Sequence, residues 1–162
     1  MLETATCKSC PLFSFNGLTT FGKVISIYDG DTIDIVITAN NTLFHFKARL
    51  YGYDSPEMKP PKDAANREEI KKKAVAARER LWELLTEGKP LADGDAHTVT
   101  FPVACHEFDK YGRLLITAFQ PGFDVSEIKG EREQWFGLSV NQQMITEGHG
   151  YSYYGGTKQT VN

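Results

Sequence analysis

Side chains that could bind a metal ion and a phosphate group occur together in three short motifs of this chain. The motifs span residues 29–32, 49–57 and 109–113, and six of their residues are candidates: Asp31, Arg49, Asp54, Ser55, Glu57 and Arg113. Carboxylate and carbonyl oxygens are the ligands that hard cations such as Ca²⁺ and Mg²⁺ prefer. The planar guanidinium group of arginine matches the oxygens of a phosphate group. The set therefore predicts metal-assisted hydrolysis of a phosphodiester.

Asp31 and Asp54 are the expected metal ligands. Each adjoins a predicted turn or strand end, where a barrel can bring both carboxylates to one point. Pro56 favours an extended backbone at Ser55, which can turn the Ser55 carbonyl outward as a third ligand. Magnesium requires near-octahedral geometry, whereas calcium accepts irregular sets of carboxylates, carbonyls and waters, so this set suits Ca²⁺ slightly better.

The remaining side chains have complementary expected roles. Glu57 lies three residues after Asp54, close enough to orient or deprotonate a water molecule, a role that typically contributes about 10²–10⁴-fold to a rate. Arg49 and Arg113 can contact phosphate oxygens bidentately and stabilise the added negative charge of a five-coordinate phosphorus.

Each motif taken alone also has a plain structural interpretation. Residues 29–32 have the composition of a common turn, and Arg113 could be an ordinary surface arginine. Arg49 could form a simple ion pair with Glu57. Their joint occurrence around a predicted barrel favours the functional interpretation.

Alternating hydrophobic residues predict three strands around the first two motifs. Residues 22–28 are rich in β-branched side chains, and residues 33–38 alternate isoleucine with other residues, so two strands should meet at a turn at 29–30. A pair of asparagines makes the next turn. In the third strand, 44–50, the even-numbered residues take one face, which leaves Arg49 pointing away from the core.

A long helix and two further strands follow. Asn66 is expected to cap a helix that Gly88 and Pro90 terminate. Its predicted buried stripe has three- and four-residue spacings and comprises Ile70, Ala74, Ala77, Leu81, Leu84 and Leu85. Strands at 97–105 and 114–119 are joined by the third motif.

The end of the chain completes a recognisable element order. Residues 121–137 are expected to form a polar loop, and residues 139–147 a short helix. Three strands, a helix, two strands and a helix fit an α+β fold, mainly β, with a five-stranded OB barrel, one long helix after the third strand and a short C-terminal helix.

Length and composition indicate one domain without a membrane anchor. A chain of 162 residues is long enough for one core and short for two ordinary domains. No apolar run approaches the roughly 20 residues needed to cross a bilayer, and the sequence predicts no export or lipidation signal. Three cysteines cannot all pair internally, which favours a reducing compartment, so a cytoplasmic location is expected. Zinc binding by Cys7, Cys10, Cys105 and His106 is a weaker alternative, because adjacent ligands rarely reach one tetrahedral ion.

The charge distribution is unusual for a protein that binds a polyanion. The formal net charge is −3, whereas phosphate-backbone binding usually depends on accumulated lysine and arginine. Residues 59–80 nevertheless carry a local basic surplus next to the second motif. This surplus could steer a polyanion toward the motif; the plainer interpretation is a solvated helix face.

In combination, the three motifs resemble those of staphylococcal nuclease (thermonuclease) and its homologous domains. They read Asp-Gly-Asp-Thr, Arg-Leu-x-Gly-x-Asp-Ser-Pro-Glu and Asp-Lys-Tyr-Gly-Arg. The resemblance runs from about residue 22 to residue 119 and resumes near Val140-Asn141. It implies an OB-fold nuclease domain at 21–155, after an N-terminal extension at 1–20 and before a tail at 156–162.

The resemblance also implies what individual residues do. It assigns Ca²⁺ binding to Asp31, Asp54 and the Ser55 carbonyl, catalysis to Arg49, Glu57 and Arg113, and substrate binding to Lys110, Tyr111 and Tyr154. Members of the family hydrolyse DNA and RNA, with single strands preferred, and leave 3′-phosphates. A monomer is expected. The alternative is a noncatalytic nucleic-acid-binding module of the same fold.

Overall fold

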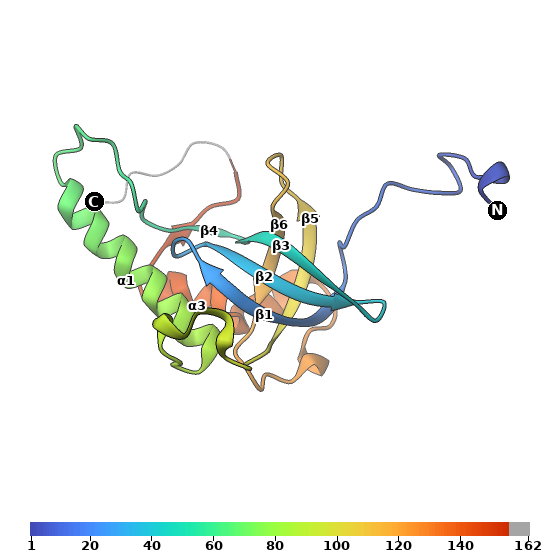
Figure 1. Ribbon diagram of the computed structural model, residues 1–162. Helices are drawn as coiled ribbons and strands as arrows, with labels where there is room; N and C mark the ends of the chain where they lie inside the picture. The colour runs from blue at the N-terminus through green and yellow to red at the C-terminus, as the bar shows by residue number, and fades with distance from the viewer. Residues whose placement is uncertain (156–162) are drawn as a thin grey trace.

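Five β-strands close into a barrel in the computed structural model, which describes residues 1–155 (Figure 1). The strands are β1 (Thr19–Ile27), β2 (Thr32–Ala39), β3 (Thr42–Leu50), β5 (Phe101–Phe108) and β6 (Leu114–Ala118). They follow the order β1-β2-β3-β6-β5 around the barrel; β3 and β6 run parallel, and the other neighbouring pairs run antiparallel. The architecture is compatible with an OB-fold, and it confirms the predicted α+β class.

Alternation along the strands separates an apolar interior from a polar outer face. The three isoleucines of β2 are at most 1% exposed, whereas Asp34 between them lies outside. On β3, Ala48 and Leu50 are fully buried and Lys47 is exposed. Arg49 therefore lies on the outer face, as the strand period predicts.

The long helix α1 (Arg67–Thr86) packs along one side of the barrel (Figure 1). Its buried residues confirm most of the predicted stripe and are Ala74, Ala77, Leu81, Trp82, Leu84, Leu85 and Thr86. Asn66 occupies the N-cap position, but its side chain makes no capping hydrogen bond, so the predicted capping contact is wrong. The helix ends at Glu87 and Gly88, both in the left-handed conformation with φ of 55° and 76°, which commonly closes helices.

The C-terminal elements fasten the second motif to the barrel. Strand β4 (Tyr53–Asp54) pairs antiparallel with β7 (Tyr151–Ser152). Helix α3 (Val140–Thr146) is capped by the Ser139 hydroxyl, which accepts from the Gln142 amide. Fully buried Asn141 donates to the carbonyls of Tyr51 and Ile116. One amide side chain thus holds the segment leading into β4 against β6.

Two regions differ from their predicted secondary structure. Strand β5 begins at Phe101 rather than at residue 97, because a 3₁₀ segment, η2 (Leu91–Ala96), precedes it and His97 turns inward to contact the Val24 carbonyl. Residues 121–137 are not only a loop. They contain η3 (Val125–Glu127), α2 (Arg132–Trp135) and the start of η4 (Phe136–Leu138), and Trp135 is buried.

The N-terminal segment supplies one residue to the core. Phe15 is 6% exposed and packs against Phe44, Phe46 and Phe108. The preceding residues, including the short η1 (Leu2–Thr4), are exposed and extend away from the barrel (Figure 1). The packed body therefore begins before residue 21. None of the helices within residues 1–155 is long and apolar enough to cross a membrane.

Candidate active site

All six candidate residues of the three motifs line one cavity of about 670 Å³ on the outer face of the barrel. They are Asp31, Arg49, Asp54, Ser55, Glu57 and Arg113, and Lys110 and Tyr111 line the same cavity. The cavity therefore collects side chains from the β1–β2 turn, from β3, from β4 and the residues after it, and from the β5–β6 turn.

The β1–β2 turn sets the position of Asp31. The Asp29 carboxylate accepts from the amides of Asp31 at 3.0 Å and Thr32 at 2.9 Å, a side-chain-to-backbone turn typical of aspartate. Gly30 is required for space, since a Cβ atom there would lie 2.7 Å from the Ala77 Cβ and 2.9 Å from the Ser55 Cβ. The turn therefore packs directly against α1 and the second motif.

Asp31 is a buried carboxylate with several donors around it. Its Oδ2 accepts from the Ser55 amide at 2.8 Å and the Ser55 hydroxyl at 3.1 Å, and its Oδ1 accepts from the Thr32 hydroxyl at 2.8 Å. Burial raises the pKa of Asp31, but the Arg49 charge and these hydrogen bonds outweigh it, so the pKa is lower than usual. Asp31 is therefore ionised at neutral pH. Burial, followed by the Asp31 charge, raises the pKa of Asp29 to about 7.

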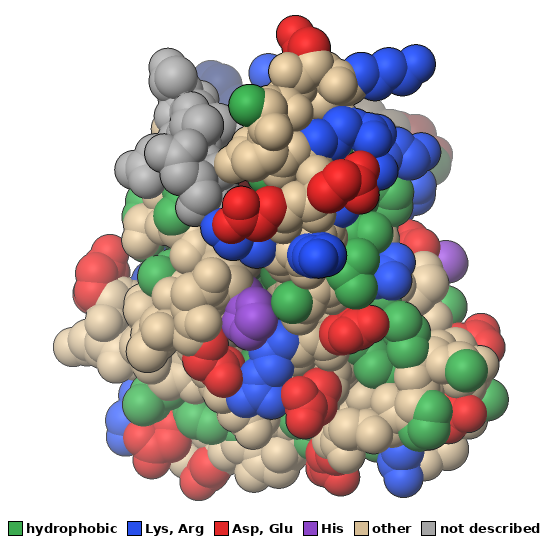
Figure 2. Space-filling view, turned by 90° about the vertical axis from the view of Figure 1, so that its left-hand side faces the viewer, with side chains coloured by type: hydrophobic (Ala, Val, Ile, Leu, Met, Phe, Trp, Pro, Cys, Tyr) green, Lys and Arg blue, Asp and Glu red, His purple; other side chains and the backbone are tan. Residues whose placement is uncertain are grey.

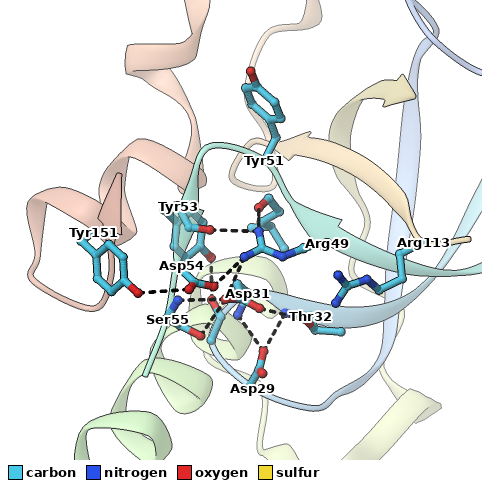
Figure 3. A network of polar contacts seen from close by, with 12 residues as sticks. Asp29, Asp31, Thr32, Arg49, Tyr51, Tyr53, Asp54, Ser55, Arg113 and Tyr151 are labelled. Carbon is cyan, nitrogen blue, oxygen red and sulfur yellow. Dashed lines mark hydrogen bonds and ion pairs between the residues drawn. The ribbon is translucent and has the colours of Figure 1, made fainter. Parts of the chain in front are cut away.

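Arg49 links the two candidate metal ligands (Figure 3). Its Nη2 donates to the Asp54 Oδ1 at 2.6 Å and lies 3.7 Å from the Asp31 Oδ2. Its Nη1 donates to the carbonyls of Tyr53 at 3.0 Å and Leu50 at 3.3 Å. These contacts fix the plane of the guanidinium group. The simple pairing of Arg49 with Glu57 is wrong, because both carboxylates that Arg49 contacts are aspartates.

Tyr151 is a member of the network that the sequence did not identify. Its hydroxyl donates to the Asp54 Oδ2 at 3.1 Å, across 97 residues of sequence, and the pairing of β4 with β7 brings the two together. Burial, and then the Asp54 charge, raise the pKa of Tyr151 to about 12. The phenol is therefore neutral and acts as a donor.

Glu57 differs from the two aspartates in having no partner. It is exposed at the cavity, and among residues 1–155 it forms no hydrogen bond or ion pair. Its carboxylate is therefore available to a water molecule or a ligand in the cavity.

Arg113 is held at the opposite side of the cavity by its own turn. Its Nε donates to the Asp109 Oδ2 at 2.7 Å, and the Asp109 Oδ1 accepts from the amides of Tyr111 and Arg113, both at 2.9 Å. In Figure 3 the guanidinium group of Arg113 is turned toward Thr32 and Arg49. The ion pair uses one edge of the guanidinium group, and the cavity faces the rest.

Of the two tyrosines next to each other near the C-terminus, only one lines the cavity. Tyr153 does so, with the Arg49 guanidinium 5.8 Å from its ring centre. Tyr154, the residue expected beside a base, is 65% exposed and packs edge-on against Tyr51 outside the cavity lining. The structure therefore brings Tyr153, rather than Tyr154, to the candidate site.

Asp31 and Asp54 could supply two carboxylate oxygens to a metal ion. Both carboxylates contact the same Arg49 nitrogen, and Ser55 is fastened to Asp31 through its amide and hydroxyl. Within residues 1–155, no three His, Cys, Asp or Glu side chains are grouped as metal ligands. Any ion here would complete its shell with carbonyl, water or phosphate oxygens, which calcium accepts.

The weaker zinc alternative is wrong for the described part of the chain. Cys7 and Cys10 are exposed on the N-terminal segment, whereas Cys105 is buried in β5. Its neighbour His106 bonds to the Thr117 hydroxyl instead. The thiols and the imidazole therefore do not form one site.

The basic residues of α1 lie on the surface beside the barrel and not in the cavity lining. Figure 2 shows this side of the molecule, where Lys and Arg side chains are interspersed with Asp and Glu. Lys71 pairs with Glu68 at 3.2 Å, and Lys73 pairs with Glu69 at 3.3 Å. The local basic surplus is thus partly neutralised on the helix itself.

Comparison with known proteins gives no family assignment: no protein-family model matches this chain, and no curated protein matches its sequence. The functional interpretation therefore depends on the residues of the three motifs and on their geometry in the cavity.

Proposed function

We propose that this chain is a calcium-dependent nuclease of the staphylococcal nuclease type, which hydrolyses phosphodiester bonds of DNA and RNA. The observation that carries the proposal is the division of labour in the cavity. Asp31 and Asp54 are buried and held by several donors, Glu57 forms no hydrogen bond or ion pair with any of residues 1–155, and Arg49 and Arg113 face the same space. A site for structure alone has no need of an unpaired carboxylate beside two arginines.

The proposed mechanism gives each side chain one task. Glu57 accepts a proton from the attacking water at its carboxylate. Arg49 and Arg113 contact the phosphate oxygens and stabilise the charge that develops on them. Calcium, when bound by Asp31, Asp54 and the Ser55 carbonyl, supplies Lewis-acid neutralisation of the phosphate charge. By the family resemblance, the water oxygen bonds to phosphorus while the bond from phosphorus to the 5′ oxygen breaks, so one product carries a 3′-phosphate and the other takes up a proton as a 5′-hydroxyl.

The cavity also suggests how an acidic chain could hold a polyanion. Lys110 and Tyr111 lie at the Arg113 side, with the Lys110 ammonium 5.1 Å from the Tyr111 ring centre. The attraction is local, because the net charge is −3. Binding should therefore weaken as salt is raised, with a slope set by the few cations at the cavity.

Cleavage of labelled single-stranded DNA, with and without calcium, tests the proposal. The chain should degrade the DNA with calcium and stop when a chelator is added. Glu57→Gln should lower kcat by about 10²–10⁴-fold, and Arg113→Ala by about 10²–10³-fold. Glu79→Gln is the matched control, since Glu79 is exposed on α1 outside the cavity lining.

Two results would contradict the nuclease assignment. Activity that survives Glu57→Gln combined with Arg113→Ala would show that the cavity is not the active site. Binding of DNA at low salt without turnover in calcium, magnesium or manganese would favour the noncatalytic binding module. Mass analysis of the ends distinguishes 3′-phosphate from 5′-phosphate products.

A further inference from the structure

The cavity continues beyond the six candidate residues along the outer face of β1, β2 and β3. Ser26, Asp34 and Lys47 line this extension. The strand register pairs Ser26 with Asp34 and Asp34 with Lys47, so the three form one row across the sheet. In the neighbouring row, Thr32 pairs with Arg49. Two residues along a strand span about 7 Å, which is close to the separation of neighbouring phosphates in an extended single strand.

A bulge in β1 creates this row. The register of β1 with β2 shifts between Val24, which pairs with Ile35, and Ser26, which pairs with Asp34. Without the extra residue, Ile25 would lie opposite Asp34. β-Bulges commonly re-aim side chains next to functional sites. Here the bulge places a hydroxyl group, instead of an isoleucine, in the cavity wall.

Lys47 supplies a positive charge that is not already neutralised. Arg49 contacts two carboxylates and Arg113 contacts a third. By contrast, Lys47 forms no ion pair within residues 1–155, although Asp34 lies opposite it on β2. The Asp34 Oδ2 instead accepts from the Ser26 hydroxyl at 2.7 Å, and its Oδ1 lies 3.8 Å from the His45 Nε2. The Lys47 ammonium is therefore available to a phosphate.

Asp34 would repel a phosphate backbone unless the ligand presents donors to it. The exocyclic amino groups of guanine, adenine and cytosine are such donors, and carboxylates accept a hydrogen bond from the amino group of cytosine in other nucleic-acid complexes. Guanine offers two adjacent N–H donors to the two carboxylate oxygens. Thymine has no exocyclic amine. A carboxylate at this position therefore favours amino-bearing bases, guanine above all.

Tyr28 provides an aromatic surface at the same side. It lines the cavity, is 57% exposed, and follows Ser26 and Ile27 into the β1–β2 turn. Exposed aromatic rings stack on bases of single strands with little regard to sequence. Tyr111, 72% exposed, lines the same cavity, and the Arg113 guanidinium lies 5.4 Å from its ring centre.

We propose that Lys47, Asp34 and Tyr28 form a nucleotide-binding subsite next to the scissile phosphate. Lys47 contacts the phosphate of the neighbouring nucleotide. Asp34 accepts hydrogen bonds from the amino group of that nucleotide's base, and Tyr28 stacks on the same base. The subsite rests on the proposed nuclease function, which it extends to a base preference. It also defines a path for a single strand across β3, from the β5–β6 turn to the bulge in β1.

Cleavage of DNA substrates of two lengths tests the role of Lys47. The value of kcat/KM is measured for a tetranucleotide and for a substrate with a single phosphodiester, which has no adjacent phosphate for Lys47 to contact. The ratio of the first value to the second should fall about tenfold in Lys47→Ala. Lys129→Ala is the matched control, because it removes one exposed lysine charge away from the cavity, and it should leave the ratio within twofold. An equal fall in both variants, or an unchanged ratio in Lys47→Ala, would overturn the subsite.

Base preference tests the role of Asp34. The substrates are thymidine pentanucleotides in which one position at a time carries guanine, adenine or cytosine instead of thymine; all of them lack a 2′-hydroxyl. Cleavage should be at least fivefold faster when guanine, rather than thymine, lies next to the cleaved bond. Asp34→Asn keeps the size of the side chain and should reduce this preference to within twofold. Uniform cleavage by the unaltered chain, or a preference retained in Asp34→Asn, would overturn the base contact.

A binding measurement separates this proposal from the nuclease assignment. Anisotropy of a labelled tetranucleotide, recorded with chelator at low salt, requires no turnover. If no metal supports cleavage but Lys47→Ala still weakens binding about tenfold and Lys129→Ala does not, the subsite stands and the nuclease assignment fails. If cleavage proceeds and neither lysine affects binding, the subsite fails alone.

Discussion

Two parts of the barrel wall bury titratable side chains in opposite ways. At the cavity, Asp31 and Asp54 are 5% and 4% exposed and lie around the positive charge of Arg49. On β5 and β6, His106 is 9% exposed, and its Nε2 forms a hydrogen bond with the Thr117 hydroxyl at 2.8 Å. The imidazole lies parallel to the Trp135 ring, with the ring centres 6.3 Å apart. One region buries charges, and the other buries a neutral ring.

The two regions have different energetic consequences. Buried charges are stable only with close counter-charges and hydrogen bonds, and hydrophobic groups of similar size often pack at least as well. Their presence at the cavity therefore indicates a functional requirement. Burial, and then the Arg132 charge, lower the pKa of His106 to about 4, so the ring is neutral at pH 7 and serves packing. The following variants test this contrast.

The largest expected effect is that of Arg49→Met. Removing the guanidinium group leaves Asp31 and Asp54 buried without their shared counter-charge, and breaking a buried pair in this way typically destabilises a protein by about 3–5 kcal/mol. Urea denaturation with chelator present should show a loss of this size. Millimolar calcium should restore part of it, because a cation between the carboxylates replaces the lost charge.

Arg113→Met is the matched control for that measurement. Arg113 is a more exposed arginine with one carboxylate partner, Asp109, and exposed ion pairs contribute about 0–1 kcal/mol. The free energy of unfolding should fall by less than 1 kcal/mol. Equal losses in the two variants would mean that the cavity network is an ordinary surface network and that the contrast is mistaken.

The next effect is a pH dependence with opposite signs in the two regions. His106 has a folded pKa of about 4, below its unfolded value of 6.5, so the unfolded chain binds the proton better and stability falls between pH 6.5 and 4. The shift corresponds to as much as about 3 kcal/mol. Asp29 has a folded pKa of about 7, above 3.8, so its protonation adds stability over the same fall in pH.

His106→Gln separates the two contributions. The free energy of unfolding of both chains is measured with chelator from pH 8 to pH 4. The value for the unaltered chain minus the value for the variant gives the contribution of His106. The stability advantage of the unaltered chain should shrink as pH falls below 6.5. A difference that does not change with pH would show that His106 titrates normally and is not effectively buried.

The contrast also shows how far the sequence alone could be interpreted. The cavity motifs could be located because each adjoins a turn or strand end, and the period of β3 placed Arg49 on the outer face. Local signals did not reveal that Arg49 pairs with Asp54, since Glu57, in the same motif, is also a carboxylate within reach. They also could not reveal Tyr151, because β4 and β7 are each two residues long and carry no periodic pattern.

The second region was harder to predict than the first. His106 was considered only as a weaker candidate zinc ligand, and nothing in the sequence indicated that its ring contacts Thr117 and Trp135, as the fold shows. Trp135 belongs to residues 121–137, where the composition indicated a polar loop. Tertiary packing decides such contacts, and a single aromatic residue in a polar segment gives too weak a local signal.

A smaller effect is expected from Thr117→Val. The substitution keeps the shape of a fully buried side chain but removes the hydroxyl that contacts His106. Loss of this hydrogen bond should lower the unfolding free energy by about 1–2 kcal/mol. Thr38→Val is the control: its hydroxyl bonds to Thr20 at the surface, and the change should stay within about 0.5 kcal/mol. Equal effects would place His106 in solvent contact.

The smallest effect is expected from Tyr151→Phe, at the edge of the cavity network. The variant removes the 3.1 Å hydrogen bond to the Asp54 Oδ2, while Arg49 still holds the Asp54 Oδ1 at 2.6 Å. Because the counter-charge remains, stability should change by no more than about 1 kcal/mol, and cleavage by no more than about threefold. Calorimetry and calcium-dependent cleavage of single-stranded DNA measure the two quantities. A loss above tenfold in kcat with unchanged stability would mean that the position of Asp54 depends on the phenol, and that charge pairing with Arg49 is not sufficient to organise this end of the site.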